Sequence, residues 1–315
     1  MTGPRQRGAG RDRTPRPAPS PVLITGCSSG IGRACALRLH RAGHTVYATA
    51  RDPGSIADLA ERGLRTLRLD VTDGPGMRAA VEAVEAEHGA VGVLVNSAGY
   101  ALSGPVEEAE PEAVRQQFET NVVGPHRLNR LVLPAMRARG RGTIVNISSI
   151  FGRYGVPGAG FYQASKHALE AMSDALRLEV APFGVRVLLI EPGPVRSTEF
   201  GTKYVDNLTS SGPDYAEFRR ELADYFDAIY TGRRATLAGA FALHADDVAR
   251  AVQKAIAPSR LNLRARYPVG FLARSTITLR RLAPDFVFDN VFARRQFPVP
   301  AGPRRRSRAQ QGDQR

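Results

Sequence analysis

Tyr162 and Lys166 could together move a proton, because they lie four residues apart in a segment whose pattern is helical from residue 160 to about 181. At this spacing the phenol and the ammonium project from the same face of a helix. A neighbouring ammonium lowers the pKa of a phenol from its usual value of about 10. The pair therefore predicts a proton donor and acceptor that works near neutral pH. The same spacing also occurs on ordinary solvated helices, so the rest of the chain must decide.

A glycine-rich loop near the start of the chain predicts a phosphate-binding turn. Residues 22–25 form a short apolar run typical of a buried parallel strand, and a helical pattern follows over 33–41. Between them, Gly26 permits a tight turn, Gly30 lets the backbone approach a pyrophosphate, and Gly32 lets helix and strand pack closely. The helix N-terminus adds amide donors. An ordinary β–α turn is the alternative, but this order of elements favours a dinucleotide. The expected contacts are Gly26, Ser28, Ser29, Gly30, Ile31 and Gly32.

Two polar residues at the ends of the next predicted strands bear on the choice of cofactor. Arg51 directly follows the strand over 44–50, where an acid would bind the ribose of NAD and a cation suits the 2′-phosphate of NADP. Ser29 is a further possible phosphate donor. Arginine is abundant in this chain, so simple surface charge is the alternative for Arg51. We favour NADP(H). Asp70, in the strand over 67–71 that also contains Val71, is placed to accept from the adenine amino group.

Apolar runs and helical patterns alternate along the chain, which predicts an α/β fold. We expect a Rossmann-like, doubly wound parallel sheet of about seven strands with helices on both faces. Ligands bind such sheets beyond the carboxyl ends of the strands. The glycine loop, Arg51, Asp70 and three further segments are all expected at that edge. The further strands are expected at 91–95, 143–147, 185–190 and 266–269, and helices at 75–88, 111–139, 160–181 and 246–257; the further edge segments are Asn96-Ser97-Ala98-Gly99, Ser148-Ser149 and Pro192-Gly193-Pro194-Val195.

The net charge of +14 is carried by the ends of the 315-residue chain. Residues 1–20 carry five arginines and one aspartate, residues 258–297 eight arginines and two aspartates, and residues 298–315 five arginines and one aspartate. Residues 21–257 have no net charge. We expect disordered basic tails at 1–20 and 298–315 around a single domain at 21–297. A nucleic-acid or anionic-membrane role for the basic ends is the alternative, but no nucleic-acid partner is expected.

Targeting and metal signals are missing from the sequence. It has no stretch of about 20 apolar residues and no apolar signal segment at its start. Its two cysteines are a poor disulfide framework and fit a reducing compartment. We therefore expect a cytoplasmic protein, and we predict no metal site.

Together these motifs resemble the short-chain dehydrogenase/reductase family in its compact single-domain form. The likeness spans about residues 21–198, and Ser97 replaces an asparagine often found in the family, which we expect to be harmless. Within the family, residues 22–32, 47–51 and 192–195 are similar to the 17β-hydroxysteroid and retinol dehydrogenase branch, which favours NADP. The matching residues are Thr25-Gly26-x-x-x-Gly30-x-Gly32, Asn96-x-Ala98-Gly99, Asn121, Ser149, Tyr162-x-x-x-Lys166 and Pro192-Gly193.

The resemblance implies a role for each matching residue. Tyr162 would exchange a proton with the substrate oxygen as hydride moves to or from the cofactor. Lys166 would lower the pKa of Tyr162 and bind the nicotinamide ribose. Ser149 would hold the substrate oxygen, with Ser148 excluded by the family spacing. Asn121 would hold a water in a proton relay to Lys166. The nicotinamide carboxamide would be positioned by Val195, Ser197 and Thr198.

The substrate end is expected to be apolar and to accept a bulky lipophilic carbonyl or alcohol, such as a steroid, retinoid or polyketide-like ketone. Residues 197–241 are rich in aromatics and in the family form a mobile lid, here with one lid helix whose apolar face includes residues 218–229. Part of that face could simply pack on the sheet. The expected substrate contacts are Ser149, Tyr162, Tyr100, Phe151 and Phe200, with Tyr154 and Phe161 also near the pocket.

The basic segment over 271–297 has a helical pattern interrupted by Pro284 and ended by Pro298. It could cover the pocket, join subunits or make weak peripheral contact with a membrane. We favour a segment that covers the pocket or packs on the body of the protein. By resemblance, we expect a homodimer or homotetramer formed through the helices that carry Asn121 and Tyr162.

Other functions stay open at this point. They are a catalytically silent NADP(H)-sensing regulatory protein of the same fold, an NAD-dependent alcohol dehydrogenase, and a sugar epimerase or dehydratase. The three-residue gap between Gly26 and Gly30 favours the reductase form over the last of these.

Overall fold

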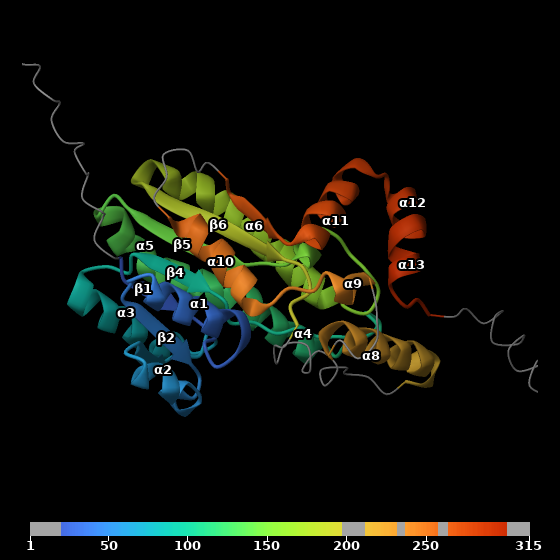
Figure 1. Cartoon of the computed structure of the whole chain (residues 1–315), viewed down its shortest axis with the longest axis horizontal. Coiled ribbons are helices and arrows are strands. Elements are labelled where there is room, and N and C mark those ends of the chain that lie inside the picture. The colour runs from blue at the N-terminus through green and yellow to red at the C-terminus, as the bar shows by residue number, and fades with distance from the viewer. Residues whose placement is uncertain (1–19, 197–211, 232–236, 258–263, 301–315) are drawn as a thin grey trace, which may run out of the picture.

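The computed structural model describes residues 20–196, 212–231, 237–257 and 264–300 (Figure 1). The two predicted tails lie almost wholly outside these ranges, and so does the first part of the predicted lid, including Ser197, Thr198 and Phe200. Among the described helices, none is long and apolar enough to cross a bilayer.

Seven parallel strands form one sheet in the order β3-β2-β1-β4-β5-β6-β7. The predicted Rossmann-like, doubly wound architecture is thereby confirmed. The chain runs outward from β1 to β3 and then returns to place β4 on the other side of β1, and ligands of such sheets bind at this reversal. The strands are β1 (Val22–Ile24), β2 (Val46–Ala50), β3 (Arg65–Arg68), β4 (Val93–Asn96), β5 (Gly142–Ile147), β6 (Val185–Pro192) and β7 (Arg266–Val269).

Helices cover both faces of the sheet, which explains why the central strands are apolar on both sides. On one face, α1 (Gly30–Arg41) and α10 (Ala245–Ile256) pack on the sheet, and the free cysteines Cys27 and Cys35 are buried in this core. On the other face lie α3 (Gly74–His88), α5 (Gly124–Ala138) and α6 (Gly160–Val180). Figure 1 shows this layered arrangement.

The single helix predicted over 111–139 is interrupted. It divides into α4 (Pro111–Phe118), a π-helical segment η2 (Glu119–Val123) and α5. Pro125 provides a physical reason, because it has no amide hydrogen to give to the carbonyl oxygen of Asn121 four residues earlier. The interruption places Asn121 at the irregular turn, where π segments often accompany functional sites.

Two short elements follow β2 that the sequence pattern did not predict, η1 (Pro53–Ile56) and α2 (Ala57–Glu61). The expected lid helix is present as α8 (Ala216–Thr231), after the short turn η5 (Pro213–Tyr215) and before α9 (Leu237–Ala240).

The chain ends in a group of helices that we call the C-terminal arm, residues 271–297. Its base is apolar: Phe288 packs with Tyr154 and Ile277 in a cluster that joins the arm to the body. Pro284 separates the first helix of the arm from the second. The arm consists of α11 (Phe271–Leu282), α12 (Asp285–Val287), the π-helical segment η6 (Phe288–Ala293) and α13 (Arg294–Gln296).

Candidate active site

One cavity of about 1180 Å³ extends along the carboxyl ends of the strands. It is lined by most of the residues that the sequence predicts to bind a cofactor and by several predicted for the substrate. The predicted cofactor residues that line it are Gly26, Ser28, Ser29, Gly30, Ile31, Gly32, Arg51, Asp70, Val71, Ala98, Gly99, Tyr162, Lys166, Pro192, Gly193 and Val195. The predicted substrate residues that line it are Tyr100, Ser149, Phe151 and Tyr162.

The glycine loop needs its glycines for steric reasons. Gly26 and Gly30 have φ values of 72° and 56°, in the left-handed region that favours glycine. A Cβ on Gly32 would lie 2.2 Å from the carbonyl oxygen of Gly26, so no side chain fits between loop and helix. The loop thus brings bare backbone and the N-terminus of α1, which begins at Gly30, to the cavity. The hydroxyl of Ser29, the N-cap residue, makes no bond to the helix backbone.

Gly99 lines the cavity near the proton-transfer pair. A Cβ on Gly99 would lie 3.0 Å from Oδ1 of Asn121 and 3.9 Å from Nζ of Lys166. The Thr25 hydroxyl accepts from the amides of Ser97 and Ala98, both at 3.0 Å, and so joins this loop to the end of β1. Bare backbone at two adjacent strand ends, together with a helix N-terminus, fits the phosphates and ribose of a dinucleotide.

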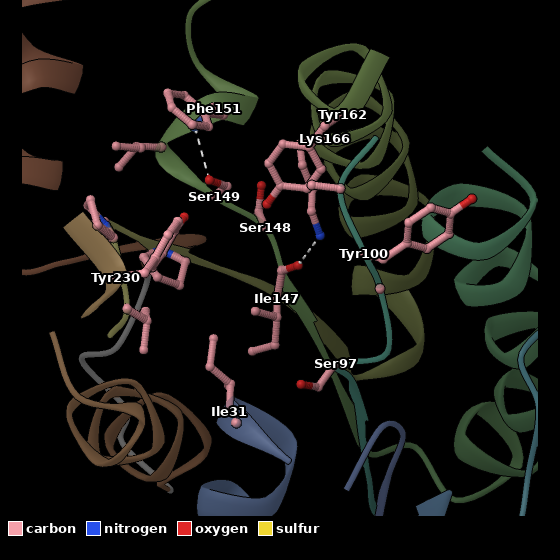
Figure 2. A pocket seen from close by; sticks show the side chains of 18 of the residues that line it. Ile31, Ser97, Tyr100, Ile147, Ser148, Ser149, Phe151, Tyr162, Lys166 and Tyr230 are labelled. Carbon is pink, nitrogen blue, oxygen red and sulfur yellow. Dashed lines mark hydrogen bonds between the residues drawn. The ribbon is translucent and has the colours of Figure 1, made fainter. Parts of the chain in front are cut away.

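Tyr162, Lys166 and Ser149 come together in the cavity, between its glycine-lined and aromatic parts (Figure 2). A hydrogen bond links the phenol of Tyr162 to Ser149, whose Oγ also accepts from the amide of Phe151 at 3.1 Å. Nζ of Lys166 donates to the carbonyl oxygen of Ile147 at 2.9 Å and lies 5.7 Å from the centre of the Tyr162 ring. The end of β5 therefore fixes both the serine and the lysine beside the phenol.

The pKa values of the pair differ from the sequence-based expectation. Burial raises the pKa of Tyr162 to about 12, although the bond to Ser149 lowers it. Burial likewise lowers the pKa of Lys166 to about 8, and the carboxylate of Glu170, one helical turn further along, partly offsets this. The physical reason is that both side chains are removed from water, which disfavours the phenolate and the ammonium alike. The expected lowering of the Tyr162 pKa by Lys166 is not the dominant effect in these surroundings.

Asn121 is buried and its side chain is engaged within the protein. Nδ2 donates to the carbonyl oxygen of Tyr100 at 3.0 Å and to Oγ of Ser165 at 3.1 Å, and Oδ1 accepts from the amide of Tyr100 at 3.2 Å. These bonds position the loop after Gly99 against α6, the helix of Tyr162. Asn121 itself lies behind Gly99 rather than among the lining residues. Its predicted part in a water relay stays a prediction.

Ser148 and Asn96 are placed differently from Ser149. Ser148 also lines the cavity, but its Oγ is buried without a hydrogen-bond partner among the described residues. Asn96 does not line the cavity. Its Nδ2 donates to Oδ1 of Asn146 at 2.8 Å and of Asn129 at 3.2 Å, so this predicted cofactor residue belongs to a buried polar network beneath the loop.

The far end of the cavity is apolar and aromatic. The expected lid helix α8 contributes four residues, whereas Phe218 and Leu222 of the same helix pack inside the protein instead. Phe161 is not among the lining residues. Residues 271–297 were expected to be able to cover the pocket, and the C-terminal arm does line it, but none of its residues was among the predicted substrate contacts. The apolar lining comprises Tyr225, Phe226, Ile229 and Tyr230 from α8, Phe271, Leu272 and Leu279 from α11, and Phe292 and Phe297.

A buried ionic cluster behind the site was also missed. Glu191, at the end of β6, is only 1% exposed and lies 3.7 Å from Arg153 and 3.6 Å from Arg266. Glu170 contacts the same two arginines, at 3.6 Å and 2.9 Å. Burial, and then Glu170, raise the pKa of Glu191 to about 7. The cluster ties α6, β6 and β7 together directly below Pro192 and Lys166.

Fold, glycine loop and the Ser149, Tyr162 and Lys166 arrangement define a nucleotide-dependent oxidoreductase, and sequence comparison agrees. The family model for short chain dehydrogenase matches residues 20–208, and the chain belongs to that family. Similar proteins include a 3-ketodihydrosphingosine reductase of Bacteroides thetaiotaomicron, 43% identical over 65% of this chain and 75% of its own. Retinol dehydrogenase 8 of Bos taurus is 34% identical over 79% of this chain and 81% of its own, which confirms the expected likeness to that branch.

Solved structures give the same result. A short-chain dehydrogenase from Streptomyces avermitilis superposes with a TM-score of 0.68 at 35% identity, covering 83% of this chain and 92% of its own. An actinorhodin polyketide ketoreductase with NADPH has a TM-score of 0.64 at 32% identity, covering 79% of this chain and 94% of its own. A family member from Burkholderia phymatum in complex with NAD has a TM-score of 0.70 at 25% identity, covering 90% of this chain and 97% of its own. Because the last two of these structures hold NADPH and NAD respectively, the likeness supports a nicotinamide cofactor without choosing between the two.

Proposed function

We propose that this chain transfers a hydride between NADP(H) and the carbonyl or secondary alcohol of a bulky lipophilic substrate. The observation that carries the proposal is the phenol of Tyr162, bonded to Ser149 beside Lys166, at the junction of the glycine-lined and aromatic parts of one cavity. When bound, the cofactor supplies or accepts the hydride. The protein orients the substrate oxygen and exchanges its proton.

Each side chain has a defined part in this reaction. Ser149 holds the substrate oxygen, because its hydroxyl already bonds the phenol and is fixed by the amide of Phe151. Tyr162 gives its proton to that oxygen in reduction and takes it back in oxidation. Lys166 holds the ribose, and when charged it favours the phenolate. Asn121 keeps the loop of Gly99 against α6 and holds the relay water expected from the sequence.

The preference for NADP(H) rests on Arg51. It follows the last residue of β2 directly, is exposed and lines the cavity, where a guanidinium can pair with a 2′-phosphate. Asp70 lines the same part of the cavity, and its Oδ1 accepts from the amide and the hydroxyl of Thr72. Those bonds hold the carboxylate at the end of the adenine pocket.

The lipophilic substrate class rests on the aromatic end of the cavity and on the printed names of two relatives. Those names refer to retinol and to a ketodihydrosphingosine, both lipids. Steroids, retinoids and polyketide-like ketones all match the apolar lining. As in the family, the active protein is a homodimer or homotetramer joined through the helices of Asn121 and Tyr162.

The test is a survey of ketones with NADPH and of alcohols with NADP⁺, followed by the absorbance of the reduced cofactor. We expect turnover that rises with the apolar size of the substrate, and higher kcat/KM with NADPH than with NADH. NADPH binding without turnover of any ketone or alcohol would instead favour the silent sensing protein. Equal or better turnover with NADH would favour the NAD-dependent dehydrogenase.

A further inference from the structure

Exposed large apolar side chains gather in the C-terminal arm. Among the described residues before residue 241, the exposed large apolar side chains are Val106, Leu178 and Phe183. The arm alone contributes Phe271, Leu279, Leu282, Phe286, Val287 and Val291. A concentration of exposed apolar side chains of this kind marks a place where a protein meets a partner or a membrane.

Several of these side chains form a stripe along α11. Phe271, Ser275, Leu279 and Leu282 follow one another at spacings of four, four and three residues, which places them on one face of the helix. The first three line the cavity, while Phe271 is also 65% exposed and Leu282 is 79% exposed. The apolar lining therefore continues out of the cavity, over its rim and along the outside of the arm.

The stripe ends at an apex where α11 turns into α12. Leu282 and Phe286 stand on either side of Pro284, and Phe286 is 78% exposed. Figure 1 shows this turn projecting away from the sheet. The base of the arm is packed on Tyr154 through Ile277 and Phe288, so the apex is presented by a folded support.

Positive charge accompanies the stripe and the apex. Residues 271–297 carry five arginines and two aspartates, and one of these aspartates, Asp285, pairs with Arg280 at 2.6 Å. Arg274 and Arg281, seven residues apart, flank the stripe on the same side of α11. Among the described residues neither of them makes an ion pair within 4 Å: Arg274 bonds only the carbonyl oxygen of Pro268, at 3.5 Å, and Arg281 acts on Glu191 from a longer distance. Arg294 and Arg295, at the end of the arm, likewise make no such pair within that part of the chain.

This combination favours an anionic lipid surface over a second copy of the chain. In a two-fold dimer each patch meets itself, which would bring like-charged arginines together across the interface. A bilayer with anionic headgroups meets apolar and basic side chains with complementary partners at once.

We propose that the apex and the α11 stripe dock on an anionic membrane surface, with Leu282 and Phe286 among the acyl chains and the mouth of the cavity facing the lipid. Arg274 and Arg281 then lie at headgroup level. A lipophilic substrate reaches the cavity from the bilayer along the stripe without crossing water. The docking itself does not depend on the proposed function; only this delivery of substrate rests on it.

The test of docking is sedimentation of the full-length chain with vesicles of phosphatidylcholine alone or mixed with phosphatidylglycerol. We expect binding to the mixed vesicles that weakens as salt is added. The double variant Leu282→Gln/Phe286→Gln keeps every charge and removes two apolar contacts, so its partition should fall by about tenfold or more. Phe183→Gln is the matched control, because Phe183 is an exposed phenylalanine just before the amino end of β6, at the opposite end of the sheet from the cavity.

Two outcomes would overturn the proposal. One is equal binding of the double variant and the wild type, which would assign any membrane affinity to the basic ends of the chain. The other is a lower molecular mass of the double variant in light scattering without vesicles, which would make the apex a contact between copies. Turnover of a water-soluble ketone by the double variant separates these results from a failure of the proposed function, because Leu282 and Phe286 are not among the cavity-lining residues.

Discussion

The two ends of the cavity are built in different ways. At the cofactor end, most contacts come from backbone and small residues at the ends of β1, β2 and β4, within the first hundred residues, and the segment after β6 adds residues 192–195. At the substrate end, they come from large side chains on α8 and α11, which follow the central strands of the sheet in the chain. The cofactor end should therefore tolerate almost no added atoms, whereas the substrate end should tolerate changes of shape at the cost of specificity.

The largest effect is expected from Gly32→Ala at the cofactor end. The new Cβ would lie 2.2 Å from the carbonyl oxygen of Gly26, so the loop must move away from the helix N-terminus. We expect NADPH affinity, measured by fluorescence, to fall on the order of 1000-fold. Gly74→Ala is the control, since a Cβ there meets no atom within 4 Å. Equal affinity of the two variants, both folded by circular dichroism, would contradict the steric account of the loop.

Arg51→Asp also tests the cofactor end, because it changes the charge there without adding bulk. The substitution replaces attraction to a 2′-phosphate by repulsion, so the ratio of kcat/KM with NADPH to that with NADH should fall by about 100-fold. Arg41→Asp, at the last turn of α1 and outside the cavity, controls for net charge. An unchanged ratio in Arg51→Asp would refute the assignment of this residue.

Leu272→Trp tests the substrate end. Leu272 lines the cavity from α11, and a larger ring there reduces the room for a bulky substrate while leaving Tyr162 and Ser149 in place. We expect kcat/KM for a bulky lipophilic ketone to fall roughly tenfold and that for a small ketone to stay near the wild-type value. An equal fall for both would show that the effect comes from the proton-transfer site or the fold and not from the pocket.

A smaller effect, on stability, is expected at the ionic cluster beneath the junction of the two ends. The pKa of Glu191 is raised from 4.5 to about 7, so between these values the folded chain holds a proton that the unfolded chain has lost. The free energy of unfolding therefore falls as pH rises through this window, by about 3 kcal/mol at most. Glu191→Gln removes the titration and should flatten the pH dependence in denaturant unfolding.

The control for this change is Glu61→Gln, on the exposed end of α2. It should keep the wild-type slope of stability against pH. A wild-type slope in Glu191→Gln as well would show that another group is responsible.

The difference between the two ends also explains what could be predicted from the sequence. The glycine loop was predictable because Gly26, Gly30 and Gly32 act through local backbone geometry. The positions of the strands along the chain could be predicted because each is a short apolar run of the length typical of a buried strand. The break before α5 was not predicted, although Pro125 was visible, because apolar periodicity continues through it.

Other features depend on packing between distant segments. The sequence indicated that residues 271–297 could cover the pocket, but which side chains of α11 line it depends on the packing of Ile277 and Phe288 with Tyr154, more than a hundred residues earlier. Asn96 reads as a loop residue in sequence, yet its side chain bonds Asn129 and Asn146 from other elements. The direction of the Tyr162 pKa shift depends on total burial, which spacing on one helix does not reveal.

The central claim is that Tyr162 exchanges the proton, and the most direct measurement is single-turnover oxidation of bound NADPH by a ketone in Tyr162→Phe. Tyr47→Phe is the matched control, because it also removes one phenol hydroxyl. The hydroxyl of Tyr47 donates to Glu87 at 2.8 Å, and Tyr47 does not line the cavity. We predict that Tyr162→Phe binds NADPH normally and loses about 100-fold or more in rate, while Tyr47→Phe keeps the wild-type rate. Substantial turnover in Tyr162→Phe, with fold and cofactor binding intact, would contradict the account.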